Sequence, residues 1–87
     1  MAAKEWTVRI NITEEGDETR ARAVLTAPGS SMTLFGRGAA RRNPIDRPVP
    51  EIGDELAVSR ALADLAQRVH GVATDDFVEL AGPVDPA

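Results

Sequence analysis

The sequence predicts an α+β fold in which a three-stranded antiparallel meander carries one long helix on one face. Two segments, 6–12 and 19–26, alternate apolar and polar residues with the period of a half-buried strand, and 32–37 repeats the pattern over a shorter length. A later segment, 54–69, has the helical period instead. Because a one-sided amphipathic helix needs an apolar surface to cover, the strands and the helix are expected to form two packed layers.

The strands are separated by turn residues. Gly16 lies in the polar segment 13–18, and Pro28-Gly29 interrupts the chain before the third strand. The loop 38–50 contains three prolines and is expected to be neither a central strand nor a helix interior. The expected core comprises Trp6, Ile10, Leu25, Leu34, Leu62 and Leu65, with the small Ala21 and Ala23 leaving room for the helix.

The helix is expected to begin at Asp54, as its N-cap, and to end at Gly71, directly after His70. A short second helical segment is expected from Thr74, and residues 82–87 are expected to fray. On a helical wheel the apolar stripe comprises Val58, Leu62, Leu65 and Val69, flanked by Ala61 and Ala66.

Composition limits the class of protein. The 87 residues predict one domain, 1–87, with a core at about 6–77, and so short a chain buries only about 60% of its unfolded surface. There is no cysteine, which excludes disulfides and thiolate metal sites. The chain has neither an apolar run long enough to span a membrane nor a secretory signal, so a cytoplasmic protein is expected. The net charge of -4 argues against general coating of nucleic acid.

Arginines are expected to gather on the sheet face that the helix leaves open. With Ile12 opposite Thr19 and Leu25 opposite Met32, strand alternation brings together Arg9, Arg20, Arg22, Phe35 and Arg37. Three interpretations stay open. The face is solvated and screened by acids such as Glu5, Glu14 or Glu18, it is a homodimer interface, or it recognises phosphate with Phe35 as a stacking ring.

A second basic group lies in the loop. Arg37, Arg41 and Arg42 could contact phosphates together with backbone amides near Gly36 and Gly38. The alternative is that Arg41 or Arg42 bonds to an acidic residue at the helix start, among Glu51, Asp54 and Glu55.

The residues indicate no catalytic, metal or cofactor site. His70, the single histidine, is explained by a favourable contact with the helix C-terminus, and no serine has a base in a matching context. The acidic residues at 51–55 lack the spacing of a calcium loop, so capping is favoured over a hard cation. We expect no enzymatic activity, no small-molecule substrate and no membrane association.

Several blocks resemble a small uncharacterised actinobacterial family described as having a double-stranded-RNA-binding-domain-like fold. The blocks are W-x-V-x-I, T-x-A-x-A-x-L, G-x-G-A-A-R-R-N-P-x-D and P-E-I-G-D-E-L-A-x-x-R-A-L, and the similarity runs from Trp6 to about Phe77. The resemblance implies a β-β-β-α core and frequent homodimers, and some dormancy-associated members have been likened to ribosome hibernation factors. True domains of that fold carry an extra N-terminal helix and lysines at the start of the last helix. Here that position holds carboxylates, so duplex RNA binding by that mode is not expected.

Two functional hypotheses follow. The first is a non-enzymatic accessory factor of stress or dormancy, which binds a macromolecular partner such as the ribosome or RNA. The alternative is a homodimeric protein–protein interaction module that binds no nucleic acid. The residues assigned to partner binding are Arg9, Arg20, Arg22, Phe35, Arg37, Arg41 and Arg42.

Overall fold

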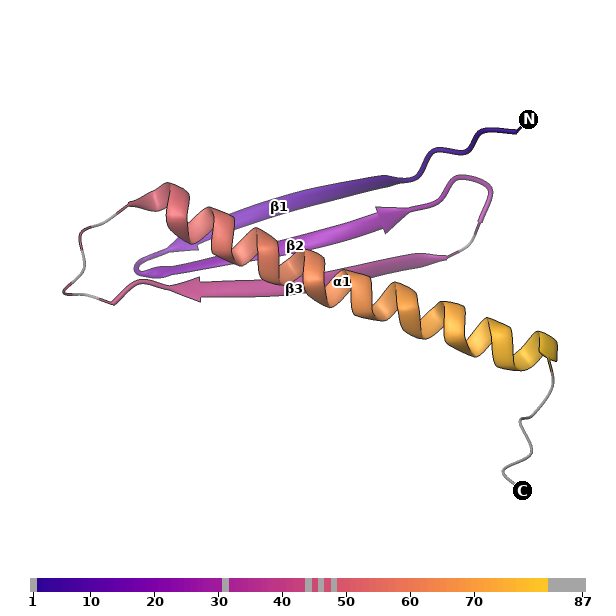
Figure 1. Ribbon diagram of the computed structural model, residues 1–87. Coiled ribbons are helices and arrows are strands. Elements are labelled where there is room, and N and C mark those ends of the chain that lie inside the picture. The colour runs from indigo at the N-terminus through magenta and orange to yellow at the C-terminus, as the bar shows by residue number, and fades with distance from the viewer. Residues whose placement is uncertain (1, 31, 44, 46, 48, 82–87) are drawn as a thin grey trace, which may run out of the picture.

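The chain forms one antiparallel sheet and one helix. The structure, a computed structural model, describes residues 2–30, 32–43, 45, 47 and 49–81. Its elements are β1 (Thr7–Glu15), β2 (Glu18–Thr26), β3 (Thr33–Arg41) and α1 (Pro50–Ala81). The strands lie in the order β1-β2-β3, and α1 crosses one face of the sheet (Figure 1). The predicted three-stranded meander with one helix layer is confirmed, while the expected fraying of 82–87 falls outside the described residues.

Both hairpins differ from the predicted register by two residues. Ile12 pairs with Ala21, and Leu25 pairs with Leu34. The strands reach further into the first turn than expected, leaving a two-residue loop whose first residue, Gly16, has a φ of 60°, as glycine has in type II′ turns. Because side chains alternate with a period of two, this shift leaves every residue on its predicted face.

The helix is longer than predicted, with 32 residues in place of two segments. It begins at Pro50, and proline is well tolerated in a first turn, so Asp54 is not the N-cap. Gly71 does not end it, because φ at Gly71 is not positive as a helix-terminating glycine requires. The Thr74 hydroxyl donates to the His70 carbonyl at 2.9 Å, a bond within the helix and not a cap. His70 therefore lies in mid-helix, and the predicted contact with a helix C-terminus is wrong.

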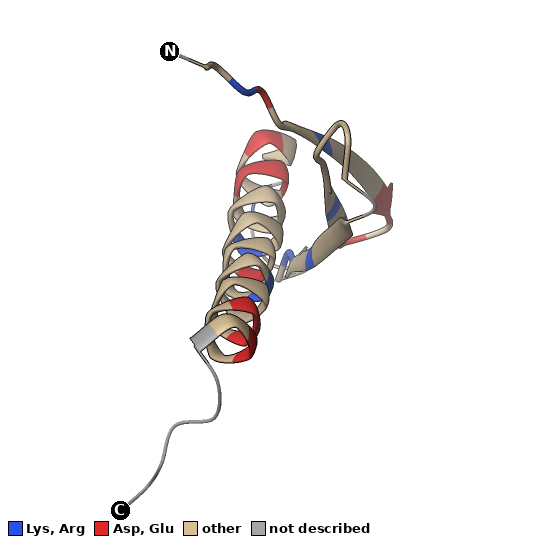
Figure 2. Ribbon diagram, turned by 90° about the vertical axis from the view of Figure 1, so that its right-hand side faces the viewer, with Lys and Arg blue, Asp and Glu red and all other residues tan. Residues whose placement is uncertain are grey.

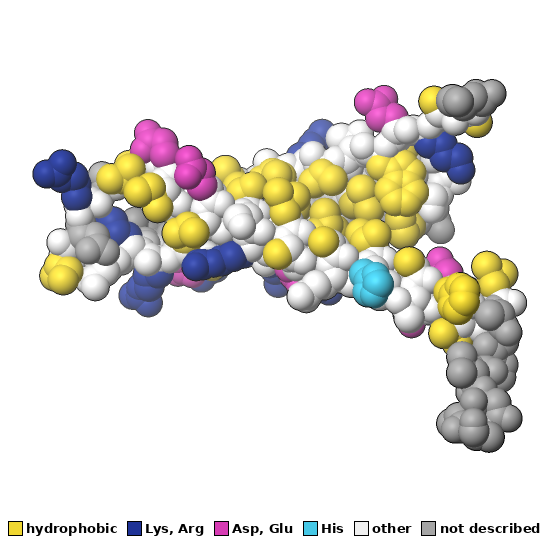
Figure 3. Space-filling view, viewed as in Figure 1, with side chains coloured by type: hydrophobic (Ala, Val, Ile, Leu, Met, Phe, Trp, Pro, Cys, Tyr) yellow, Lys and Arg dark blue, Asp and Glu magenta, His cyan; other side chains and the backbone are white. Residues whose placement is uncertain are grey.

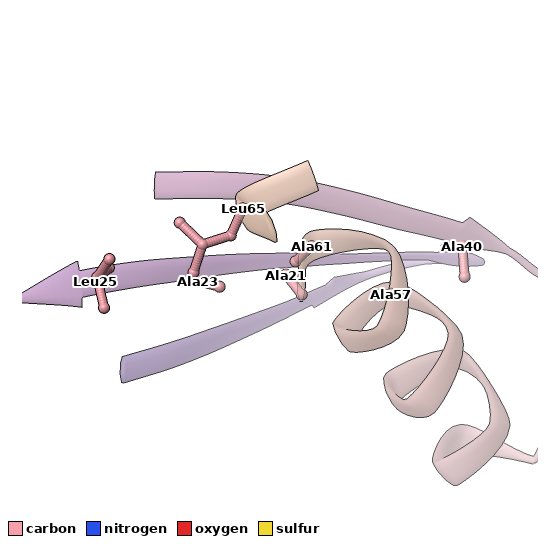
Figure 4. Close-up of a cluster of buried hydrophobic side chains, with 7 residues drawn as sticks. All are labelled: Ala21, Ala23, Leu25, Ala40, Ala57, Ala61 and Leu65. Atoms are coloured by element: carbon pink, nitrogen blue, oxygen red, sulfur yellow. The ribbon is translucent and has the colours of Figure 1, made fainter. Parts of the chain in front are cut away.

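The helix rests directly on two glycines of β3. A β-carbon on Gly36 would lie 2.8 Å from the Leu65 Cα, and one on Gly38 would lie 2.7 Å from the Arg60 Cβ. The expected loop at 38–50 is thus wrong at its beginning, because β3 continues to Arg41. Since these glycines belong to a strand covered by α1, their amides do not form the suggested phosphate loop. The buried cluster at this contact comprises Ala21, Ala23, Leu25, Ala40, Ala57, Ala61 and Leu65 (Figure 4).

Close contact at the glycines displaces the helix from the predicted core. α1 packs on β3 and β2 and barely touches β1. Trp6 and Ile10, expected to be buried, are 53% and 36% exposed, and Leu62 is 40% exposed. Within the predicted helical stripe only Leu65 belongs to the buried core, at 4% exposed, because small residues occupy the line that meets the sheet.

Candidate functional site

The sheet face that α1 does not cover, here called the open face, carries most of the predicted site. Gly36, Gly38 and Ala40 point toward α1, so the alternate positions of β3 point away from it. The strand register places six of the predicted residues on the open face: Arg9, Arg20, Arg22, Phe35, Arg37 and Arg41. Glu15 and Glu18 lie on the same face. Figure 2 shows basic positions along the strands, whereas acidic positions mark both ends of α1. Six of the seven predicted residues therefore share one surface.

Arg42, the seventh predicted residue, does not belong to this surface. Strand alternation turns it away from the open face, and its guanidinium forms an ion pair with Asp17 in the β1–β2 turn, at 2.5 Å. The Arg42 amide also donates to the Asp17 carbonyl, at 2.8 Å. These two contacts fasten the end of β3 to the first hairpin, which is a structural role.

Three guanidinium groups surround Phe35 on the open face. Arg22 lies 4.5 Å from the ring centroid, Arg37 5.1 Å and Arg68 6.0 Å. Arg22 and Arg37 are directly opposite in the β2–β3 pair, where like charges repel. The negative π-face of the ring attracts both cations and offsets part of this repulsion. We call Arg22, Phe35, Arg37 and Arg68 the ring cluster.

Arg68 reaches the ring cluster from α1 and is not among the residues that the sequence assigned to the site. Its Nε lies 3.3 Å from the Asp64 carboxylate, which also accepts the Arg37 amide at 2.9 Å. The Arg37 amide first, and then the Arg68 guanidinium, hold the pKa of Asp64 below its ordinary value. One turn earlier, Arg60 donates to the Ala39 carbonyl at 2.6 Å. Arg60, Asp64 and Arg68 are spaced four residues apart and therefore lie on one side of α1. This spacing was the sequence feature from which their common position beside β3 could have been predicted.

Few carboxylates neutralise the open face. Arg20 pairs with Glu18 at 3.0 Å, which lowers the pKa of Glu18. Within the described part of the chain, no carboxylate lies at ion-pair distance from the guanidiniums of Arg9, Arg22, Arg37 or Arg41. Of the acids expected to screen this face, Glu18 does so and Glu14 lies on the covered face. The open face thus has an excess of positive charge on a chain of net charge -4.

A hollow of about 460 Å³ lies between the first turn, the end of β3 and the start of α1. It contains charges of both signs, with Arg41, Arg42 and Arg47 near Glu14 and Asp17. Beside it, a hydrogen bond with Asp54 raises the pKa of Glu14, and the repulsion between the two acids adds to this shift. No group of three or more metal-ligating side chains occurs among the residues that the structure describes. In the same part of the chain, no helix has the length and apolar character needed to cross a membrane.

The comparisons with known proteins agree with this architecture. The family model described as Rv2632c-like matches residues 4–84. The uncharacterized protein Mb1767 of Mycobacterium bovis is 52% identical over 74 residues, covering 85% of this chain and 77% of its own. The uncharacterized protein Rv2632c of Mycobacterium tuberculosis is 42% identical over 74 residues, with the same coverage. The crystal structure of Rv2632c matches with a TM-score of 0.85 and 34% identity, over 97% of this chain and 98% of that one. The resemblance to a small actinobacterial family is thereby confirmed, and the chain belongs to the Rv2632c-like family.

Proposed function

We propose that this chain acts by binding and not by catalysis, and that its open face binds the phosphate groups of RNA, with ribosomal RNA as the partner. Arginine is suited to this role because its planar guanidinium meets phosphate oxygens with two parallel hydrogen bonds. The open face presents five arginines on adjacent strands, at the spacing of a sheet. Binding at the ribosome in stressed or dormant cells, which the family resemblance suggests, belongs to this proposal.

The observation that carries the proposal is the ring cluster. Arg22 and Arg37 stand side by side over Phe35, without a carboxylate partner among the described residues. In this proposal Phe35 orients the two arginines, and stacking of a base on its ring is not required. An anion bound between two cations that repel each other stabilises both of them, and a phosphate group can be this anion.

The binding mode differs from that of double-stranded-RNA-binding domains. Those domains hold phosphates at the start of the last helix, where this chain has Glu51, Asp54 and Glu55. Carboxylates at that position repel phosphate, so the sheet and not the helix start carries the proposed interface. A sheet surface reaches single-stranded or looped RNA more readily than the grooves of a duplex.

Co-sedimentation with purified ribosomes across a salt series tests the proposal. We expect association in low salt and its loss between about 50 and 200 mM, because phosphate contacts release counterions. The double variant Arg22→Gln/Arg37→Gln should bind more weakly, with a salt slope smaller by about 2. Lys4→Gln/Arg47→Gln removes the same charge away from the open face and should retain the slope. Absence of association at any salt, or equal losses in both double variants, would overturn the proposal.

A further inference from the structure

One level of the open face consists of threonine on all three strands. Thr7 of β1 lies directly opposite Thr26 of β2, and Thr26 lies directly opposite Thr33 of β3. Strand alternation turns these side chains to the same side as Arg9 and Arg22, away from α1. All three are exposed, and adjacent strands are about 4.8 Å apart, so the side chains form a line across the sheet. We call Thr7, Thr26 and Thr33 the threonine row.

The hydroxyls of the threonine row have no hydrogen-bond partner within the described part of the chain. The Ser30 hydroxyl accepts from the Met32 amide, and the Thr74 hydroxyl donates to the His70 carbonyl, whereas the structure gives the threonine row no such bond. Strand propensity favours threonine at each of these positions, but it depends only on the branched side chain. The hydroxyls are therefore available to a ligand.

The threonine row is adjacent to the ring cluster. Phe35 and Thr33 are two residues apart on β3 and share the open face, so they are separated by about 7 Å along the strand. The guanidiniums of Arg22 and Arg37 lie 4.5 Å and 5.1 Å from the Phe35 ring centroid. A phosphate bound by these two arginines therefore lies about one level of the sheet from the threonine row.

The opposite end of the open face differs in charge. Glu15 and Glu18 pair there, next to the first turn. Carboxylates repel phosphate, whereas neutral hydroxyls do not, so a nucleic-acid backbone at the ring cluster is more stable on the side of the threonine row. The side of the molecule that carries α1 is less suited to a polyanion, because hydrophobic side chains gather there between α1 and β1 (Figure 3).

We propose that the threonine row binds the 2′-hydroxyls of the RNA whose phosphates lie on the ring cluster. In a nucleotide the sugar is bonded directly to the phosphate, so a ribose reaches the threonine row when its phosphate contacts the arginines. The threonine hydroxyl and the 2′-hydroxyl each donate and accept hydrogen bonds, so the two groups are complementary. This inference rests on the proposed function and deepens it, since the 2′-hydroxyl is the group by which a protein distinguishes RNA from DNA. The threonine row thus makes the open face selective for RNA.

Fluorescence anisotropy with labelled oligouridylate and oligodeoxyuridylate of equal length tests the inference, because these probes differ at the 2′ position. We expect the RNA probe to bind about 10-fold more tightly, as two hydrogen bonds of ordinary strength would give. The salt slopes should be nearly equal, because both probes carry the same number of phosphates. A 2′-O-methyl probe keeps the oxygen but cannot donate a hydrogen bond, so it should bind more weakly than the RNA probe.

The variant Thr26→Val/Thr33→Val separates the hydroxyls from the shape of the side chains. Valine is branched like threonine and favours strands, so the fold should be retained, as circular dichroism would verify. The variant should bind the RNA probe about 10-fold more weakly and the DNA probe as before. Thr13→Val, on the open face but nearer the first turn, should bind both probes as the wild type does. Arg22→Gln/Arg37→Gln should weaken the binding of both probes and keep the ratio of their affinities.

Failure of this inference differs from failure of the proposed function. Equal affinities for RNA and DNA, both weakened by salt and by the arginine variant, would overturn the inference and leave the proposed function standing. A preference for RNA that persists in Thr26→Val/Thr33→Val would do the same. Binding of neither probe in low salt would overturn both, because the open face would then not hold RNA phosphates.

Discussion

The amide of Arg37 donates to the carboxylate of Asp64 at 2.9 Å, joining the free edge of β3 to the side of α1. Asp64 also holds Arg68, so one carboxylate connects the helix layer to the ring cluster. Exposed strand edges invite pairing with other chains, and here Asp64 and Arg60 of α1 bond two backbone groups of that edge, the Arg37 amide and the Ala39 carbonyl.

Asp64→Asn should lower the free energy of unfolding at neutral pH. It should also make that free energy depend less on pH in the acid range. Because the folded state lowers the pKa of Asp64, the carboxylate stabilises the fold above its ordinary pKa of 3.8. That contribution is lost as the pH falls through the lower folded-state value. Urea denaturation between pH 2 and pH 7, near the range in which carboxylates titrate, would measure it. Asp75→Asn on the overhanging part of α1 is the control, and equal acid profiles for both variants would contradict the assignment.

Gly36→Ala should destabilise the fold by about 1–3 kcal/mol or more, because the added methyl overlaps the backbone of α1 at Ala61 and Leu65. Gly71→Ala is the matched control in the same chain. Gly71 has open space around it and ordinary helical geometry, so alanine there should stabilise by about 0.5–1 kcal/mol. Changes of opposite sign in the free energy of unfolding, measured by urea denaturation, would confirm that the glycines of β3 are required for close contact with the helix. A neutral Gly36→Ala would contradict it.

Alternation along the strands was enough to predict the sheet and its two faces. It was not enough to place the helix across the sheet, since that position depends on how closely the backbones approach at Gly36 and Gly38. The helical wheel assigned the contact with the sheet to large residues such as Leu62, whereas alanines of α1 make most of that contact. The length of the helix was not predicted, because Gly71 was taken as its end. The local sequence does not distinguish a glycine that ends a helix from a glycine inside one.

Glu14 and Asp54 should make stability fall as the pH rises above the ordinary range of a glutamate. The pKa of Glu14 is raised by its hydrogen bond with Asp54, so the stabilising proton is bound below the ordinary value of 4.5 and is lost as the pH rises through the folded-state value. Glu14→Gln keeps a donor toward Asp54 and removes one negative charge. It should therefore be more stable than the wild type at neutral pH in thermal denaturation. Glu15→Gln, the next residue on the open face, should show no such gain, and equal gains in both would point to net charge alone.

The placement of the candidate residues on one face was predictable wherever strand alternation decided it, as at Arg22 and Arg37. Arg68 was missed because its contact with Phe35 depends on where α1 lies relative to β3, which the helical period alone does not specify. Arg42 was listed with the open-face arginines because of the charge density of a short window of sequence, and charge density carries no information about faces. Its pairing with Asp17 depends on the two-residue turn at Gly16, which was predicted longer than it is.

Replacing the two central arginines by lysine distinguishes oriented guanidiniums from simple positive charge. Arg22→Lys/Arg37→Lys keeps the net charge and loses the planar group that lies over Phe35. If the ring cluster orients phosphate ligands, ribosome co-sedimentation should weaken several-fold while the salt slope stays unchanged, because the number of released counterions is the same. Arg22→Gln/Arg37→Gln should reduce both affinity and slope. Full affinity in the lysine variant would show that Phe35 has no part in recognition and that the open face acts only through its total charge.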